Sequence, residues 1–196
     1  MPLGRKGNNK MTTNKSVLAW IEEMKNLLNP DKVVWIDGSE EQLEALRKEA
    51  CETGEMIKLN EEKLPGCYLH RTRENDVARV EDRTFICCRD EKDAGPTNNW
   101  KNPQEAYQML FDIARGSYKG RTMYVIPYSM GPVGSPLAKI GYEVTDSIYV
   151  VLNMSIMTRV GTAVEEVLGD SEDWIKGLHA MCDVCLLYTS PSPRDR

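Results

Sequence analysis

Apolar residues recur at helical spacing in two early stretches of the chain. In the first stretch they are Val17, Trp20, Ile21, Met24, Leu27 and Leu28. This spacing predicts an amphipathic helix that ends at Asn29-Pro30. In the second stretch, Ser39 and Gln42 are spaced as a capping box and precede Leu43 and Leu46. We therefore expect a second helix, which ends where Gly54 can adopt the left-handed conformation.

Short apolar runs between polar turns predict strands. These runs are residues 33–36, 56–59, 67–69, 84–88, 123–126 and 148–152. Two further helices are predicted from their caps. Asn102-Pro103 opens one whose inner face would carry Tyr107, Leu110 and Ile113, with Gly116 at its end. Ser171, followed by Glu172 and Asp173, would cap the last helix, which would contain His179. The alternation of strands and helices favours an α/β fold.

The composition is that of a globular protein with one well-buried core. The 196 residues are 41% hydrophobic and 28% charged. A net charge of −5 argues against a general affinity for nucleic acid or for anionic membranes. No apolar run approaches the roughly 20 residues that cross a bilayer, and the basic start of the chain is not followed by an apolar stretch. We expect a cytoplasmic protein.

Few residues are spaced for metal binding or nucleophilic catalysis. Cys182 and Cys185 form a Cys-x-x-Cys pair, but no second pair lies at a zinc-binding spacing, so we expect no metal there. His70 and His179 are the two histidines, and neither has a second ligand nearby in the sequence. The glycine- and proline-containing loop 130–136 lacks the Gly-Lys-Ser/Thr ending of a P-loop, which favours a rigid connection. Glu165 and Glu166 are expected on a solvated helix face.

One charged run, Val77-Ala78-Arg79-Val80-Glu81, could bind an anion. In an extended chain, Arg79 and Glu81 would project from one face, while Ala78 and Val80 could be buried on the other. A guanidinium matches a carboxylate with two parallel hydrogen bonds and stays charged at every working pH. A dicarboxylate or a phosphorylated acid would suit such a site. The alternative is a solvated edge on which four arginines and four acids between Arg71 and Arg83 pair weakly.

Several runs resemble GTP-dependent phosphoenolpyruvate carboxykinase of the bacterial type. They are Trp35-Ile36-Asp37-Gly38-Ser39, residues 75–84 around Arg79, residues 93–100 (Asp-Ala-Gly-Pro-Thr-Asn-Asn-Trp) and the stretch from Lys119 to Ser147. The resemblance extends from about Met11 to about Asp183. It implies the N-terminal, substrate-side domain of such an enzyme: a mixed sheet with flanking helices, here incomplete.

The resemblance also implies an activity and a site. The family converts oxaloacetate and GTP to phosphoenolpyruvate, GDP and carbon dioxide in gluconeogenesis, which makes it a lyase and a decarboxylase. By its match, Arg79 binds the substrate carboxylate, and Glu81 contacts the lid of the active site. The full-length family is a cytoplasmic monomer that uses Mn²⁺, together with Mg²⁺ bound to GTP. Its P-loop and metal ligands match nothing before Asp183, so we expect this fragment alone to bind no metal or nucleotide and to be inactive.

The two ends differ in character from the rest of the chain. Residues 1–10 and 184–196 are expected to be non-native or disordered, which leaves 11–183 as the carboxykinase-like domain. Two hypotheses therefore stand: the N-terminal part of an active carboxykinase, or a non-catalytic fragment that binds a small dicarboxylate or has a structural role.

Overall fold

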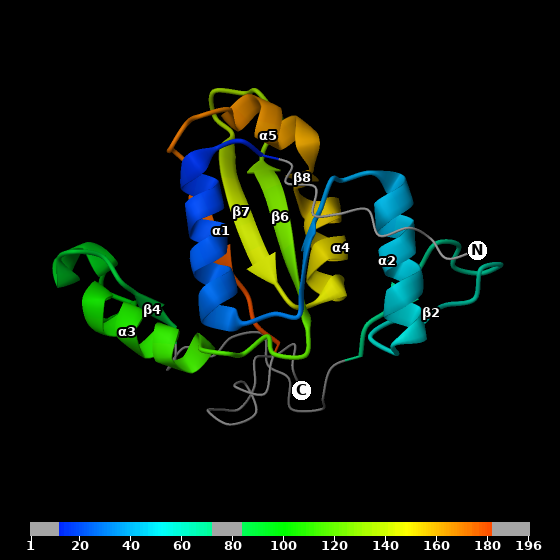
Figure 1. Ribbon diagram of the computed structural model, residues 1–196, viewed down its shortest axis with the longest axis horizontal. Helices are drawn as coiled ribbons and strands as arrows, with labels where there is room; N and C mark the ends of the chain where they lie inside the picture. Colours follow the sequence, from blue (N-terminus) through cyan, green and yellow to red (C-terminus); the bar gives the residue numbers. More distant parts are fainter. Residues whose placement is uncertain (1–11, 72–83, 182–196) are drawn as a thin grey trace.

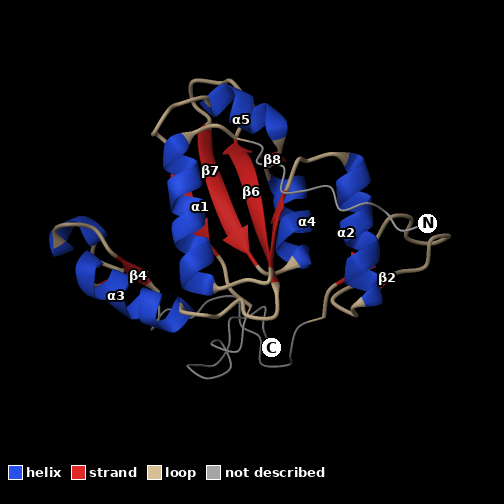
Figure 2. Cartoon of the chain, viewed as in Figure 1, coloured by secondary structure: helices blue, strands red, loops and turns tan. Residues whose placement is uncertain are grey.

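The computed structural model describes residues 12–71 and 84–181. A mixed five-stranded sheet lies at its centre, with helices on both faces (Figures 1 and 2). This arrangement confirms the predicted α/β class with a mixed sheet and flanking helices. In the described part of the chain, no helix is long and apolar enough to span a membrane.

The sheet has the strand order β1-β6-β7-β9, with β8 paired to the end of β6. Its members are β1 (Lys32–Trp35), β6 (Thr122–Met130), β7 (Lys139–Thr145), β8 (Arg159–Val160) and β9 (Ile175–Leu178). β6 runs parallel to β1 and antiparallel to β7 and β8, whereas β7 runs parallel to β9. Seven consecutive residues of β6 are buried, as expected of a central strand covered on both faces.

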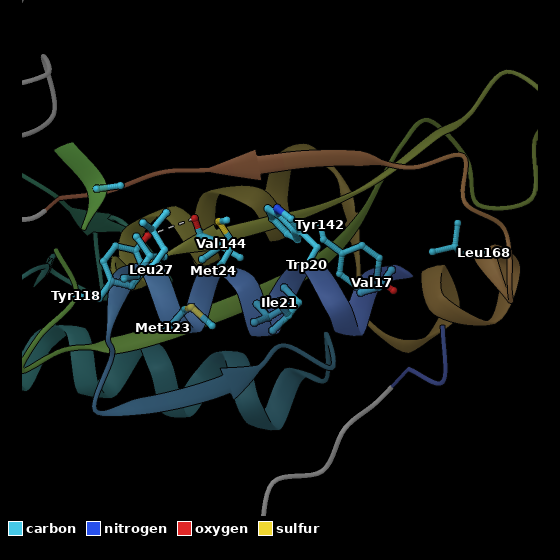
Figure 3. Close-up of a cluster of buried hydrophobic side chains, with 13 residues drawn as sticks. Val17, Trp20, Ile21, Met24, Leu27, Tyr118, Met123, Tyr142, Val144 and Leu168 are labelled. Atoms are coloured by element: carbon cyan, nitrogen blue, oxygen red, sulfur yellow. Dashed lines mark hydrogen bonds between the residues drawn. The ribbon is translucent and has the colours of Figure 1, made fainter. Parts of the chain in front are cut away.

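Alternate residues of β6 enter two different hydrophobic clusters. Met123 and Val125 pack under α1 (Lys15–Leu28), in the cluster drawn in Figure 3. Tyr124 and Ile126 face α2 (Glu40–Glu52) and α4 (Ile148–Met157) on the opposite side. The first two predicted helices are confirmed, with the predicted apolar positions buried and Asn29 in the left-handed conformation.

Smaller elements flank this centre. Two two-stranded sheets are formed by β2 (Ile57–Lys58) with β3 (Tyr68–Leu69), and by β4 (Phe85–Ile86) with β5 (Asn99–Trp100). The other helical elements are the short 3₁₀ turn η2 (Glu91–Ala94), α3 (Pro103–Ala114) and α5 (Thr162–Leu168). Loop 130–136 is the connection between β6 and β7, as predicted, with turn hydrogen bonds from Ser135 N to Pro132 O and from Ala138 N to Ser135 O.

Two predicted elements are wrong in type. Residues 148–152 are not a strand but the first half of α4, which Ser147 caps by accepting a hydrogen bond from Val150 N. A short apolar run has the same pattern in a buried strand and in a helix that is buried on most sides. No helix follows Ser171: its hydroxyl accepts a hydrogen bond from Asp173 N in a turn, and β9 comes next. Ser171 illustrates that the same side-chain bond serves a turn or a helix cap. His179 therefore follows a strand.

Two predicted environments are also wrong. On α3, most of the expected inner face is turned outward: Tyr107 is 64% and Leu110 56% exposed, Ile113 is half-buried, and the buried residues are Ala106 and Ala114. Apolar periodicity locates a stripe on a helix but does not say whether a neighbour covers it. Glu165, expected in solvent, is only 7% exposed.

Candidate functional site

The predicted site residues Arg79 and Glu81 lie between residues 71 and 84, outside the described residues. The structure does describe both ends of the segment that carries them. One end follows β3, beside α2, and the other precedes β4, near α3. α2 covers one face of the central sheet and α3 contacts α1 on the other, so the two described ends lie near elements on different sides of the sheet (Figure 1).

His70 anchors the chain just before this segment. Its Nδ1 lies 2.7 Å from the carbonyl oxygen of Glu55, and its ring stacks on Tyr149 of α4 with 4.1 Å between ring centroids. Because a carbonyl only accepts hydrogen bonds, Nδ1 must carry the proton. The other nitrogen, Nε2, is buried and has no hydrogen-bond partner. In the neutral ring, Nε2 is an acceptor at the edge of a groove of about 640 Å³ between α2 and α4.

The side chain of Glu55 continues this anchor to the start of α4. Its Oε1 accepts hydrogen bonds from Ser147 Oγ at 2.7 Å and from Tyr149 N at 2.9 Å. A carboxylate is stabilised at the N-terminal end of a helix by free N–H groups and by the helix dipole. Glu55 therefore holds the connection between α2 and β2 against α4. Together with His70, it fixes the direction in which the chain leaves β3.

The chain after the segment is fixed by β4 and its neighbours. β4 pairs with β5, and the indole Nε1 of Trp100 donates to Cys88 O at 2.9 Å. The ammonium group of Lys101 lies 5.1 Å from the ring centroid of Phe85. Asn98 Nδ2 donates to Ala94 O at 2.7 Å within the same loop. Residues 93–100, one of the runs that resemble the carboxykinase family, thus support the strand that follows the predicted site.

A second polar cluster lies where β7 ends. The buried carboxylate of Asp146 accepts hydrogen bonds from Arg121 Nη1 at 3.2 Å and from Met181 N at 2.7 Å. His179 donates its backbone N–H to Val144 O at 2.8 Å, and its carbonyl accepts a hydrogen bond from Tyr118 Oη. These bonds join the chain after β9 to the end of β7. The partners of the Asp146 carboxylate are therefore groups of the protein itself, and its burial has a structural explanation.

The described residues contain no group of three or more His, Cys, Asp or Glu side chains placed to hold a metal ion. His70 and His179 each bond to the protein itself, and Cys182 and Cys185 lie outside the described residues. Sequence reasoning missed Glu55 and Ser147, which the fold brings together although 92 residues separate them. Only the capping preference of a serine gave a signal, but residues 148–152, which follow it, were predicted to be a strand.

The comparisons with known proteins agree on one family. The family described as "Phosphoenolpyruvate carboxykinase N-terminal domain" matches residues 19–193. A protein of Anaeromyxobacter sp. (strain K) named phosphoenolpyruvate carboxykinase [GTP] is 51% identical over 172 residues, which are 88% of this chain and 29% of that protein. Proteins of the same name from Corynebacterium kroppenstedtii and Corynebacterium efficiens are 51% and 46% identical, over 88% and 87% of this chain. The chain thus spans less than a third of the length of these relatives.

Proposed function

The chain belongs to the family of phosphoenolpyruvate carboxykinase N-terminal domains, and we propose on this basis that it serves as the N-terminal part of a GTP-dependent enzyme of that kind. The whole enzyme would convert oxaloacetate and GTP to phosphoenolpyruvate, GDP and carbon dioxide, in gluconeogenesis. The observation that carries the proposal is the 51% identity over 88% of this chain to relatives named for that activity.

Within this enzyme, Arg79 would bind the carboxylate of the organic acid. The supporting argument is chemical, because a guanidinium offers two parallel N–H donors to a carboxylate and does not lose its charge. The described ends of its segment add a structural argument. His70 and Glu55 hold the preceding residues against α4, and β5 pairs with the strand that follows. These contacts hold the described residues on either side of the segment in place.

Glu81 would act two residues further on, at the lid that closes over the substrate. In an extended segment it would project from the same side as Arg79. The support for this role is the resemblance of the run around Arg79 to the carboxykinase family.

The metal ions of the reaction would be held elsewhere in the enzyme. Residues 12–71 and 84–181 contain no group of three or more His, Cys, Asp or Glu side chains placed to hold a metal ion. When bound, such an ion supplies a positive charge that stabilises a developing enolate. The part played by this chain would be to bind and orient the acid, and this chain alone would bind neither metal nor nucleotide. We further propose that the enzyme acts in the cytoplasm as a monomer, with oxaloacetate, phosphoenolpyruvate, GTP and GDP as its partners and without nucleic acid or membrane.

Phosphoenolpyruvate formation by the full-length enzyme tests the proposal. We expect product from oxaloacetate with GTP and Mn²⁺ and much less with ATP, measured by a coupled assay for phosphoenolpyruvate. This chain by itself should form none under the same conditions, which controls for contaminating host enzymes. Activity that requires ATP rather than GTP, or no phosphoenolpyruvate at all, would refute the assignment.

A further inference from the structure

α5 carries a carboxyl group inside the protein. Glu165 is 7% exposed, whereas its neighbour Glu166 is exposed. Its Oε1 accepts a hydrogen bond from the hydroxyl of Tyr142 at 3.4 Å, and its Oε2 is buried with no hydrogen-bond partner. An ionised carboxylate needs donors on both oxygens to offset the loss of its hydration, and here one oxygen lacks them.

The Tyr142 side chain connects this carboxyl group to the core beneath α1. Its ring is fully buried and lies edge-on to Trp174, with 5.4 Å between ring centroids, and to Trp35, at 6.3 Å. Trp174 in turn donates from its indole Nε1 to Ser16 Oγ in the first turn of α1 at 2.9 Å. Figure 3 shows Tyr142 above the middle of α1, within the labelled cluster. A change at Glu165 therefore reaches the start of α1 through contacts between side chains.

A second connection joins the same elements through the backbone. Asn14 Oδ1 accepts hydrogen bonds from Ser16 N and Val17 N and so caps α1. Its Nδ2 donates to the carbonyls of Gly169 and Ser171, both at 2.8 Å, just after α5 ends. Leu168, on the last turn of α5, belongs to the same hydrophobic cluster as Val17. The position of α5 and the cap of α1 are thus held together.

The elements around Glu165 carry few groups that could neutralise its charge. The titratable and charged residues on them are Lys15, Glu22, Glu23 and Lys25 on α1, Tyr124 and Tyr128 on β6, Lys139, Tyr142 and Glu143 on β7, Arg159 on β8, Glu166 on α5, Asp170, Glu172 and Asp173 on the turn that follows, and Lys176 on β9. Tyr124, Tyr128 and Glu143 lie on the opposite face of the sheet by strand alternation. Burial raises the pKa of Glu165 to about 7, and the hydrogen bond from Tyr142 opposes this rise.

We propose that Glu165 is a pH-sensitive switch, which holds α5 against the capped start of α1 when it is protonated and loosens this corner of the domain when it ionises. The direction follows from linkage. The pKa of this acid is higher in the folded protein than its ordinary value of 4.5. Its contribution to stability is therefore full below that ordinary value and is lost as the pH rises through about 7.

The test compares the 196-residue chain with two matched variants, Glu165→Gln and Glu166→Gln. Denaturant midpoints and amide-exchange protection, corrected for intrinsic rates, are measured at about pH 5 and about pH 8. In the wild type and in Glu166→Gln, α5 and the first turn of α1 should lose protection at the higher pH. Glu165→Gln should remove most of this loss. An unchanged pH dependence in Glu165→Gln would overturn the proposal.

A direct titration keeps the test independent of the variants. The carboxyl carbon of Glu165 can be followed by NMR in the wild-type chain, where a midpoint near 7 is expected and a midpoint near 4.5 would refute the switch. Tyr142→Phe removes the hydroxyl donor that stabilises the charged form, so it should move the midpoint to a higher pH. A midpoint that moves to a lower pH in this variant would contradict the assigned geometry.

Discussion

Glu55 joins two segments that are 92 residues apart in the chain. Its Oε1 accepts hydrogen bonds from both the hydroxyl of Ser147 and the backbone N–H of Tyr149. Its backbone carbonyl accepts a hydrogen bond from His70 Nδ1. One residue therefore positions the start of α4 and also the chain that leads toward Arg79. Because these partners are distant in sequence, no local pattern could have indicated the contact.

The contribution of Glu55 to stability can be measured by replacing it. Glu55→Ala removes the acceptor from two donors at a helix start, and we expect it to lower the free energy of unfolding by about 1–3 kcal/mol. Glu55→Gln keeps an acceptor oxygen without the charge and should cost less. The control is Glu52→Ala, because that side chain is exposed and makes only a long ion pair with Lys48, which should change stability by less than about 0.5 kcal/mol. Equal effects of Glu55→Ala and Glu52→Ala would contradict the role given to Glu55.

Other single residues were predictable only in part. Ser39 accepts a hydrogen bond from Gln42 N at 3.2 Å, as the capping box predicts. Gln42, however, does not return the bond to Ser39. Its oxygen accepts from Asp37 N at 2.8 Å and its nitrogen donates to Trp35 O. The burial of Glu165 had no signal in the sequence, since its partner Tyr142 lies on a strand that local pattern did not identify.

At the scale of elements, cap chemistry and periodicity identified the helices that have one apolar face. α1, α2 and the start of α3 follow from such patterns, because a stripe of large apolar residues or an Asn-Pro cap is a local property. α4 was missed because it is apolar on nearly all sides, and α5 because it spans only seven residues. The exposed stripe of α3 shows that a local pattern can predict a helix but not the burial of its apolar face, since exposure depends on which neighbouring elements cover it.

The turn before α5 approaches the turn after β1 closely, and this contact requires glycine. Gly161 has a φ of +103°, and a Cβ there would collide with the carbonyl of Asp37. We expect Gly161→Ala to lower stability by more than about 2 kcal/mol, since both strain and overlap with backbone atoms oppose it. Gly169, at the other end of α5, has a φ of +51° but open space around it. Gly169→Ala should cost less, since its φ of +51° with ψ of −128° brings backbone strain of about 1–3 kcal/mol but no overlap with other atoms. The stabilities of both variants are measured by thermal or urea unfolding. A Gly161→Ala variant as stable as Gly169→Ala would contradict the close contact between the two turns.

For the whole molecule, the fold class could be predicted from the sequence but the strand order could not. In the order β1-β6-β7-β9, the pairs β1–β6 and β7–β9 join strands that other elements separate in the chain, and these pairings leave no trace in a single sequence. The family assignment, on which the proposed function rests, came from a different source. The runs around Arg79 and between Lys119 and Ser147 indicated the family, and the matching of residues 19–193 established it. The physical argument for Arg79 remains a prediction, because its segment lies outside the described residues.

The most direct test of the account is a kinetic comparison of Arg79→Ala and Arg89→Ala in the full-length enzyme. Arg79→Ala should raise the KM for oxaloacetate about ten- to a hundredfold, as expected for losing hydrogen bonds to a charged group, and should leave the KM for GTP nearly unchanged. Arg89 is exposed just after β4 and serves as the matched control, which should behave as the wild type. A normal oxaloacetate KM in Arg79→Ala would contradict the claim that this domain binds the substrate carboxylate through Arg79.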